Sequence, residues 1–208
     1  MDQAALAALG ADPIDWRYKG FPAADPPPTP ADVRERGWSL LDGDLPLPVL
    51  ALREDALDAN IATMRAWCAA HDASLAPHGK TTMAPELFRR QLDAGCWAIT
   101  VATIAQARVC AAFGVPRILI ASEVVDPAGL GWIGAAQRGG SEVWLLVDAP
   151  AGVERLAVAR ADGDPPVRVL VESGMPDGRA GARAAAAADA PARAGAAAVG
   201  GGRGGGGG

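Results

Sequence analysis

Short apolar runs alternate with longer amphipathic segments along most of the chain. From Leu45 onward, six runs are apolar throughout, which is typical of strands buried on both faces. These runs lie at 47–52, 73–77, 97–101, 117–121, 142–147 and 167–171. The segments between them carry apolar residues at helical spacing, as Leu57 and Ile61 do within residues 54–71. The pattern therefore predicts about six βα units.

Helix-start and helix-stop signals support this division. Pro85 suits the first turn of a helix over residues 85–93. Thr103 and Gln106 have the spacing of a capping box, and the helix that they open ends at Gly114. Further helices are predicted at 126–138 and 151–160.

Apolar strands that alternate with helices indicate a parallel sheet with both faces covered. Two α/β architectures fit six such units: a partial (β/α)8 TIM-like barrel and an open, doubly wound sheet. A complete barrel needs about 250 residues. The pattern begins near residue 45 of a 208-residue chain, so eight units cannot close unless another chain supplies the rest.

The two ends of the chain differ from the middle. Residues 1–44 are Ala-rich and then Pro-rich, and we interpret them as an N-terminal arm before a partial barrel at 45–183. Residues 184–208 are almost entirely Ala and Gly, and a stretch of this kind buries too little apolar area to offset its ordering entropy. We expect a disordered, low-complexity tail. A frameshifted or truncated continuation is favoured over a flexible linker.

Composition excludes several classes of partner. The net charge is −5 and the pI about 5.0, which argues against nucleic acid and against an anionic membrane surface. No apolar run reaches the roughly 18 residues of a membrane span, and the first ten residues lack the basic region of a signal peptide. Three widely spaced cysteines set among apolar residues are typical of reduced core thiols. We therefore expect a cytoplasmic protein.

Lys80 is the most informative residue for chemistry. The chain has 17 arginines but only two lysines, and lysine alone of these two can lose its proton and attack a carbonyl. Lys80 follows the predicted strand at 73–77, and the carboxyl ends of barrel strands form the active-site face. Residues 74–83 contain no acid, which favours a neutral amine. The alternative is a solvated lysine in a turn.

The sequence around Lys80 resembles a known family. Residues 75–88, LAPHGKTTMAPELF, together with 91–95 and 99–103, are similar to the D-serine dehydratase-like and D-threonine aldolase family. The amino-acid deaminase members are the most similar, and the resemblance extends over roughly residues 12–183. It implies an alanine racemase-like N-terminal barrel that binds pyridoxal 5′-phosphate (PLP) and is followed by a β domain.

The resemblance also implies roles for four residues. Lys80 would form the Schiff base with PLP, and His78 would be its neighbour in the cofactor site. Arg179, in the segment 171–181, matches the family's arginine at the cofactor, where a fixed cation holds the phenolate oxygen. Thr100, at a strand end, is the fourth candidate. From the residues alone, Arg179 is instead a solvated loop arginine and Thr100 packs within a strand.

The chain also departs from the family's pattern. No segment matches the phosphate-binding loop, and the C-terminal β domain is absent. In many members that domain supplies a His and a Cys to a divalent metal, so we assign no metal ligands here. The resemblance implies a small amino-acid substrate and allows a homodimer, and it leaves open whether this chain is active by itself.

The resemblance predicts a lyase that converts a β-hydroxy D-amino acid to an α-keto acid and ammonia. The alternatives are a D-threonine aldolase-type C–C lyase, a non-catalytic PLP-binding protein and an inactive fragment. Residues 129–134 also match GxGxxG, with Asp148 19 residues after Gly129, which would indicate a dinucleotide-dependent oxidoreductase. Spacing counts against that interpretation, because Pro127 separates the motif from the preceding strand.

Overall fold

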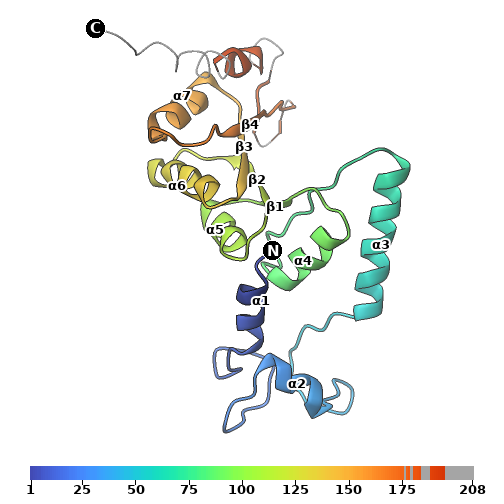
Figure 1. The fold of residues 1–208 in the computed structure, drawn as a ribbon. Coiled ribbons are helices and arrows are strands. Elements are labelled where there is room, and N and C mark those ends of the chain that lie inside the picture. The colour runs from blue at the N-terminus through green and yellow to red at the C-terminus, as the bar shows by residue number, and fades with distance from the viewer. Residues whose placement is uncertain (176, 179, 184–187, 195–208) are drawn as a thin grey trace. The chain divides into compact units, whose positions relative to one another are not determined.

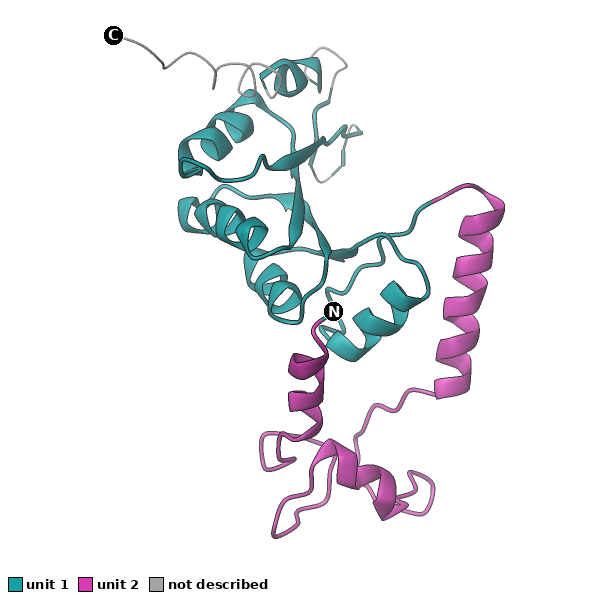
Figure 2. Ribbon diagram, viewed as in Figure 1, with its two compact units in different colours: residues 1, 74–208 teal, residues 2–73 magenta. Residues whose placement is uncertain are grey.

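The computed structural model describes residues 1–175, 177–178, 180–183 and 188–194 (Figure 1). It divides into two compact units (Figure 2). Residues 2–73 form one unit, and residues 74–208 together with Met1 form the other. The three-part division expected from the sequence stays a prediction.

The unit of residues 2–73 contains three helices, α1 (Gln3–Gly10), α2 (Pro30–Arg36) and α3 (Glu54–Ala70). Short polar side chains cap the first two. The Asp2 carboxylate accepts hydrogen bonds from two main-chain N–H groups at the start of α1, and Thr29 and Asp32 form a capping box on α2. Helix α3 confirms the helical spacing of residues 54–71, although none of its residues is buried.

The strand predicted at 47–52 is wrong, because these residues form no strand. Leu47, Leu50 and Leu52 are 77%, 89% and 66% exposed. A strand forms only where its main-chain groups find a partner strand, and Pro48 has no N–H to offer one. An apolar run signals a tendency to be buried, but it cannot supply the neighbour that a strand requires.

The unit of residues 74–208 contains a parallel sheet in the order β1-β2-β3-β4. The strands are β1 (Ile99–Val101), β2 (Arg117–Glu123), β3 (Glu142–Val147) and β4 (Arg168–Val171). The helices are α4 (Pro85–Asp93), α5 (Ile104–Ala112), α6 (Pro127–Arg138) and α7 (Pro150–Ala159). Each of these elements falls within or beside a predicted segment, so this part of the α/β alternation is confirmed.

The sheet has one covered face among the described residues. Helices α5, α6 and α7 lie on the same side of the strands (Figure 1). Ile118, Val143 and Leu145 point to that side and are fully or almost fully buried, whereas Trp144 and Leu146 alternate with them and are only half-buried. The expectation that both faces are covered is wrong for these elements. Helices on one side are typical of a barrel wall and argue against a doubly wound sheet.

The half-buried face carries a polar cluster across three strands. Glu142 on β3 pairs with Arg117 on β2 and Arg168 on β4, at 2.9 and 2.7 Å. The Trp144 indole N–H donates to the same carboxylate at 3.1 Å. Burial by itself raises the pKa of Glu142, but the two guanidinium groups and the indole outweigh it and lower the pKa below its usual value. The carboxylate therefore links three neighbouring strands.

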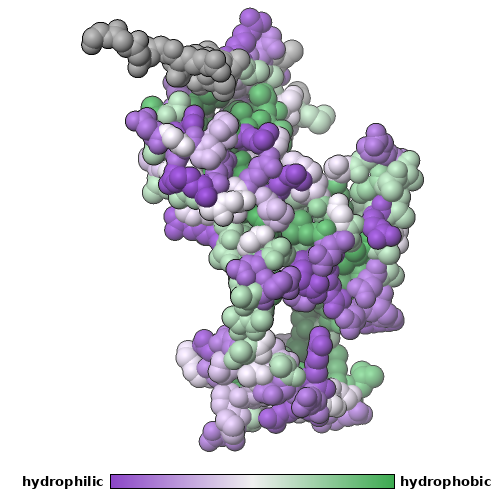
Figure 3. Space-filling model, in the orientation of Figure 1, coloured by the Kyte–Doolittle hydropathy of each residue, from purple (hydrophilic) through white to green (hydrophobic). Residues whose placement is uncertain are grey.

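Two further predictions concern the cysteines and membrane-spanning segments. None of the three cysteines forms a disulfide, but only Cys110 is buried, so the expectation of core thiols is wrong for Cys68 and Cys96. Burial raises the pKa of the Cys110 thiol to about 11. None of the helices within the described residues is long and apolar enough to span a membrane. Figure 3 shows hydrophobic residues interspersed with hydrophilic ones on the face that it draws.

The predicted disordered tail is only partly within the described residues. Residues 188–194 are helical, with Asp189 and Arg193 paired one turn apart at 3.4 Å, and the expected disorder of the tail stays a prediction. Alanine has the highest helix propensity, which explains a short helix in so simple a sequence. Residues 184–187 and 195–208 lie outside the described part of the chain.

Candidate active site

Lys80 lies in a turn at the carboxyl edge of the sheet. Residues 75–79 run beside β1: the N–H groups of Trp97 and Thr100 donate to the carbonyls of Leu75 and Pro77, each at 2.8 Å. The Gly79 N–H donates to the Thr100 carbonyl, also at 2.8 Å. Only the His78–Thr100 bridge is regular enough to count as strand pairing. The prediction of a strand at 73–77 is therefore wrong, because residues 75–79 form an irregular edge segment along β1 that leads to Lys80.

Two hydrogen bonds fix the peptide groups on either side of the Lys80 α carbon. The Gly79 carbonyl accepts from the Met83 N–H at 2.9 Å, which closes a turn over Lys80, Thr81 and Thr82. The Lys80 carbonyl accepts from the Gln106 side-chain amide at 3.1 Å. Because a peptide group is planar, holding both groups fixes the backbone dihedrals of Lys80 and the direction of its Cα–Cβ bond.

Gly79 allows this turn to lie against the core. A Cβ atom built on Gly79 would lie 2.4 and 2.7 Å from two ring atoms of Phe88 and 3.2 Å from Ile99 Cγ2. Phe88 and Ile99 are fully buried, so neither can easily move away. The residue before Lys80 must therefore have no side chain, whereas Lys80 itself is half-buried and can extend from the sheet edge.

His78 and Thr100 both lie near the Lys80 turn. His78 comes two residues before Lys80 in the chain, and Thr100 on β1 is paired with His78. His78 is exposed, and its main chain bridges to Thr100. Thr100 is buried, and its hydroxyl donates to the Ala76 carbonyl at 2.8 Å. This bond accounts for Thr100 by strand packing, and its role at a cofactor stays a prediction. Arg179 lies outside the described residues.

Two further polar residues at this edge did not stand out in the sequence. Gln106 was identified only as part of a helix cap, although its amide reaches Lys80. Glu123 ends β2 just after a register shift against β3, and such irregularities are common beside active sites. Its Oε1 atom is buried and has no hydrogen-bond partner among the described residues. Position at a strand end was the signal that could have identified Glu123.

These residues fit the covalent attachment of PLP. Lys80 is half-buried, and its main chain is held on both sides. A buried carboxylate oxygen without a partner, as at Glu123, can accept a hydrogen bond from a ligand or from water. Attachment by Lys80 is the part of a PLP site that this geometry supports. No group of three or more His, Cys, Asp or Glu side chains suited to a metal occurs in the described ranges.

The GxGxxG match does not form a phosphate-binding loop. Gly129, Gly131 and Gly134 all lie inside α6, which is capped by the Asp126 side chain rather than opened by a glycine turn. A Cβ on Gly134 would lie 2.2 Å from the carboxylate of Asp164, so close packing explains this glycine. The geometry argues against a dinucleotide-dependent oxidoreductase.

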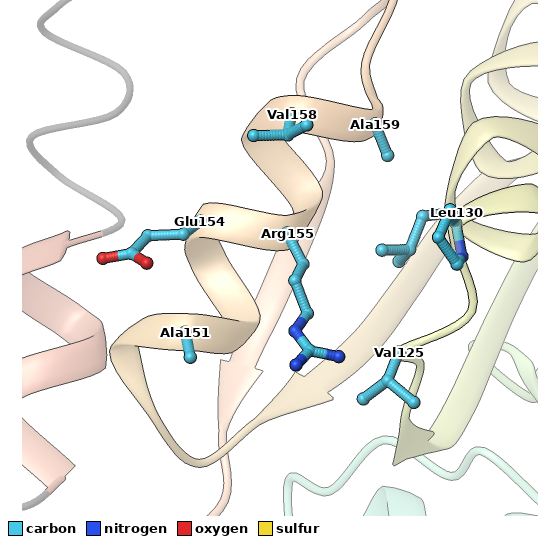
Figure 4. Close-up of a pocket in the computed structure, with 8 residues that line it drawn as sticks. Val125, Leu130, Ala151, Glu154, Arg155, Val158 and Ala159 are labelled. Carbon is cyan, nitrogen blue, oxygen red and sulfur yellow. The ribbon is translucent and has the colours of Figure 1, made fainter.

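A groove of about 590 Å³ lies elsewhere, between α6 and α7. Arg155 reaches from α7 into the groove toward Val125, while Glu154 points away from it (Figure 4). Apolar residues, Leu130 and Val158 among them, form much of the lining. Of the residues predicted for the cofactor site, the three that the structure describes, His78, Lys80 and Thr100, do not line this groove.

Comparisons with known proteins agree with the fold and with the resemblance. A D-threonine aldolase from Arthrobacter sp. is 31% identical over 159 residues, which cover 76% of this chain and 40% of that protein. A D-threo-3-hydroxyaspartate dehydratase from Delftia sp. is 30% identical over 146 residues, or 70% of this chain and 38% of that protein. The crystal structure of D-threonine aldolase from Filomicrobium marinum superposes with a TM-score of 0.66 at 26% identity, covering 70% of this chain and 39% of that one.

The chain thus spans about 40% of the length of the relatives that it matches. The family model described as alanine racemase, N-terminal domain, matches residues 52–200. That range includes the Lys80 turn and all four strands of the sheet. The chain belongs to the alanine racemase N-terminal domain family.

Proposed function

We propose that this chain carries the PLP-attachment part of an enzyme that acts on D-amino acids. The observation that carries the proposal is the position of Lys80: a half-buried lysine at the carboxyl edge of a parallel sheet, with its main chain held on both sides. When bound, PLP withdraws electrons from the bond that breaks at the substrate's α carbon. Lys80 Nζ would hold the cofactor, and the same amine would move a proton at the substrate's α carbon.

The proposed reaction is the loss of water from a β-hydroxy D-amino acid, after which water hydrolyses the resulting imine to an α-keto acid and ammonia. Similarity to a dehydratase of D-threo-3-hydroxyaspartate supports this version. Similarity to a D-threonine aldolase supports a second version, in which the Cα–Cβ bond breaks and an aldehyde leaves. We place the enzyme in the cytoplasm, as a homodimer, with a small amino acid as its substrate and with His78, Thr100 and Arg179 around the cofactor.

The test uses the two lysines of the chain. Purified protein is incubated with PLP, reduced with borohydride and digested, and the mass increment of the reduced adduct is located by peptide mapping. We expect the increment on the peptide that contains Lys80. A Lys80→Ala variant should lose it and the matched Lys19→Ala variant should keep it. Equal labelling of both variants would mean that PLP reacts with surface amines and would overturn the proposal.

A second measurement separates the two reactions. The PLP-loaded chain is given D-threonine or L-threonine, and the products are identified. Ammonia with a keto acid, from the D-enantiomer alone, would support dehydration, whereas glycine with acetaldehyde would support aldol cleavage. A Lys80 adduct without turnover would indicate a PLP-binding chain that is not itself catalytic.

A further inference from the structure

We propose that Gln106 is a positioning residue that aims Lys80, through a hydrogen bond from its side-chain amide to the Lys80 carbonyl. The inference rests on the proposed PLP attachment and adds to it a residue 26 positions further along the chain. Three contacts of Gln106 carry the argument. Its N–H donates to Thr103 Oγ1 at 3.3 Å, its Oε1 accepts from the Ala102 N–H at 2.9 Å, and its Nε2 donates to the Lys80 carbonyl at 3.1 Å.

The two ends of the Gln106 amide are not interchangeable. Ala102 offers a main-chain donor and Lys80 a main-chain acceptor, so only one orientation of the amide satisfies both. The oxygen end accepts from the N–H of Ala102, the residue before the N-cap Thr103, and the carboxylate of a glutamate could accept the same bond. The nitrogen end has no function in the cap. It serves only the Lys80 carbonyl.

The Gln106 contact holds the peptide group that follows the Lys80 α carbon, which the Met83 hydrogen bond of the turn does not hold. The Met83 N–H holds the peptide group before the Lys80 α carbon, and Gln106 holds the peptide group after it. Without the amide, the second peptide group can rotate and the lysine stem samples more directions. The covalent adduct requires one of those directions, so a freer turn should hold PLP more weakly.

The matched variants are Gln106→Glu and Thr103→Ala. Gln106→Glu keeps the size of the side chain and the acceptor for Ala102 but loses the donor to Lys80. Thr103→Ala removes a contact of the cap and leaves the amide in place. The affinity for PLP is measured by following the absorbance of the adduct as PLP is added. Borohydride trapping measures the adduct on Lys80, and thermal unfolding measures stability.

We expect Gln106→Glu to weaken PLP binding about three- to tenfold, the effect of losing one hydrogen bond. Thr103→Ala should leave the affinity unchanged even if it lowers the melting temperature. The difference in PLP affinity between Gln106→Glu and the parent should shrink as the pH falls and the new carboxyl becomes protonated. The protonated acid again has a hydrogen that it can donate to the Lys80 carbonyl. A purely structural role for Gln106 would not produce this pH dependence.

The outcomes separate this inference from the proposed function. If the parent chain forms no adduct on Lys80, the proposed function fails and the inference fails with it. If the parent forms the adduct and Gln106→Glu binds PLP equally well at every pH, only the positioning role is overturned. The same conclusion follows if Thr103→Ala weakens PLP binding as much as Gln106→Glu does, because the helix cap would then explain both effects.

Discussion

At the scale of single residues, Gly79 shows how the core restricts the candidate site. Its backbone lies against the ring of Phe88, whose exposed fraction is 0%, and the space for a methyl group is missing. The position of Lys80 therefore depends on a preceding residue, Gly79, that has no side chain. A glycine at this position is a packing requirement.

We predict that Gly79→Ala destabilises the fold by about 1–3 kcal/mol, the usual cost of overpacking a core. It should also reduce borohydride trapping on Lys80, since the turn must move to relieve the contact. Urea denaturation measures the first effect and peptide mapping the second. Gly131→Ala is the matched control, because a Cβ there meets only the Ala159 carbonyl, at 3.9 Å. Unfolding midpoints as high as that of the parent in both variants would contradict the prediction.

The sequence indicated Lys80 but not the contacts that hold it. Lys80 stood out because lysine is rare in this chain and because a predicted strand ends just before it. The partner Gln106 lies 26 residues away and was explained by a local cap. Spacing along the chain reveals contacts within one helix or turn. It carries no information on which side chain bridges two elements.

At the scale of elements, α6 is held by the loop that follows α7. The Asp164 side chain is 2% exposed and pairs with Arg138 at the end of α6. It also accepts from the Ala161 N–H at 2.9 Å, which closes its own loop. One carboxylate thus connects the helix to the segment that leads into β4.

Removing this carboxylate should loosen α6 and the loop together. We predict that Asp164→Ala lowers the free energy of unfolding by about 1–3 kcal/mol, because it leaves a main-chain donor unsatisfied and removes the partner of Arg138. The exposed neighbour Asp162 provides the control, and Asp162→Ala should change stability by no more than about 0.5 kcal/mol. Denaturant titration of the two variants checks this, and equal effects would refute it.

Elements were predictable where the pattern and the packing agree. Strand β3 alternates buried and half-buried residues against two neighbouring strands, and its prediction was confirmed. The run at 47–52 has the same apolar character but pairs with no described strand. Sequence periodicity reports which residues tend to be buried. Strand formation depends in addition on a partner, and that partner is a property of the assembled sheet.

At the scale of the whole molecule, the sheet ends in an exposed edge. Strand β4 pairs on one side with β3 and with no further strand among the described residues. Leu170 on this strand is 39% exposed. An unpaired edge with apolar side chains is a template for association with another copy.

We therefore expect the chain to self-associate as its concentration rises, and Leu170→Lys to reduce that association, because a charge on an edge strand opposes pairing. Val158→Lys adds the same charge to an 86% exposed position on α7 and should have little effect. Sedimentation velocity over a range of concentrations compares the two variants with the parent. Identical behaviour of both would show that net charge, not the strand edge, governs association.

The turn at Lys80 has one more consequence, for the order in which the protein is made. All of the contacts described for the turn come from residues 75–106, namely the edge segment, Phe88, β1 and the first turn of α5. Such short sequence separations cost little loop entropy and form early. A ribosome that has released α5 has already supplied every group that holds the lysine, before β2, β3 and β4 exist.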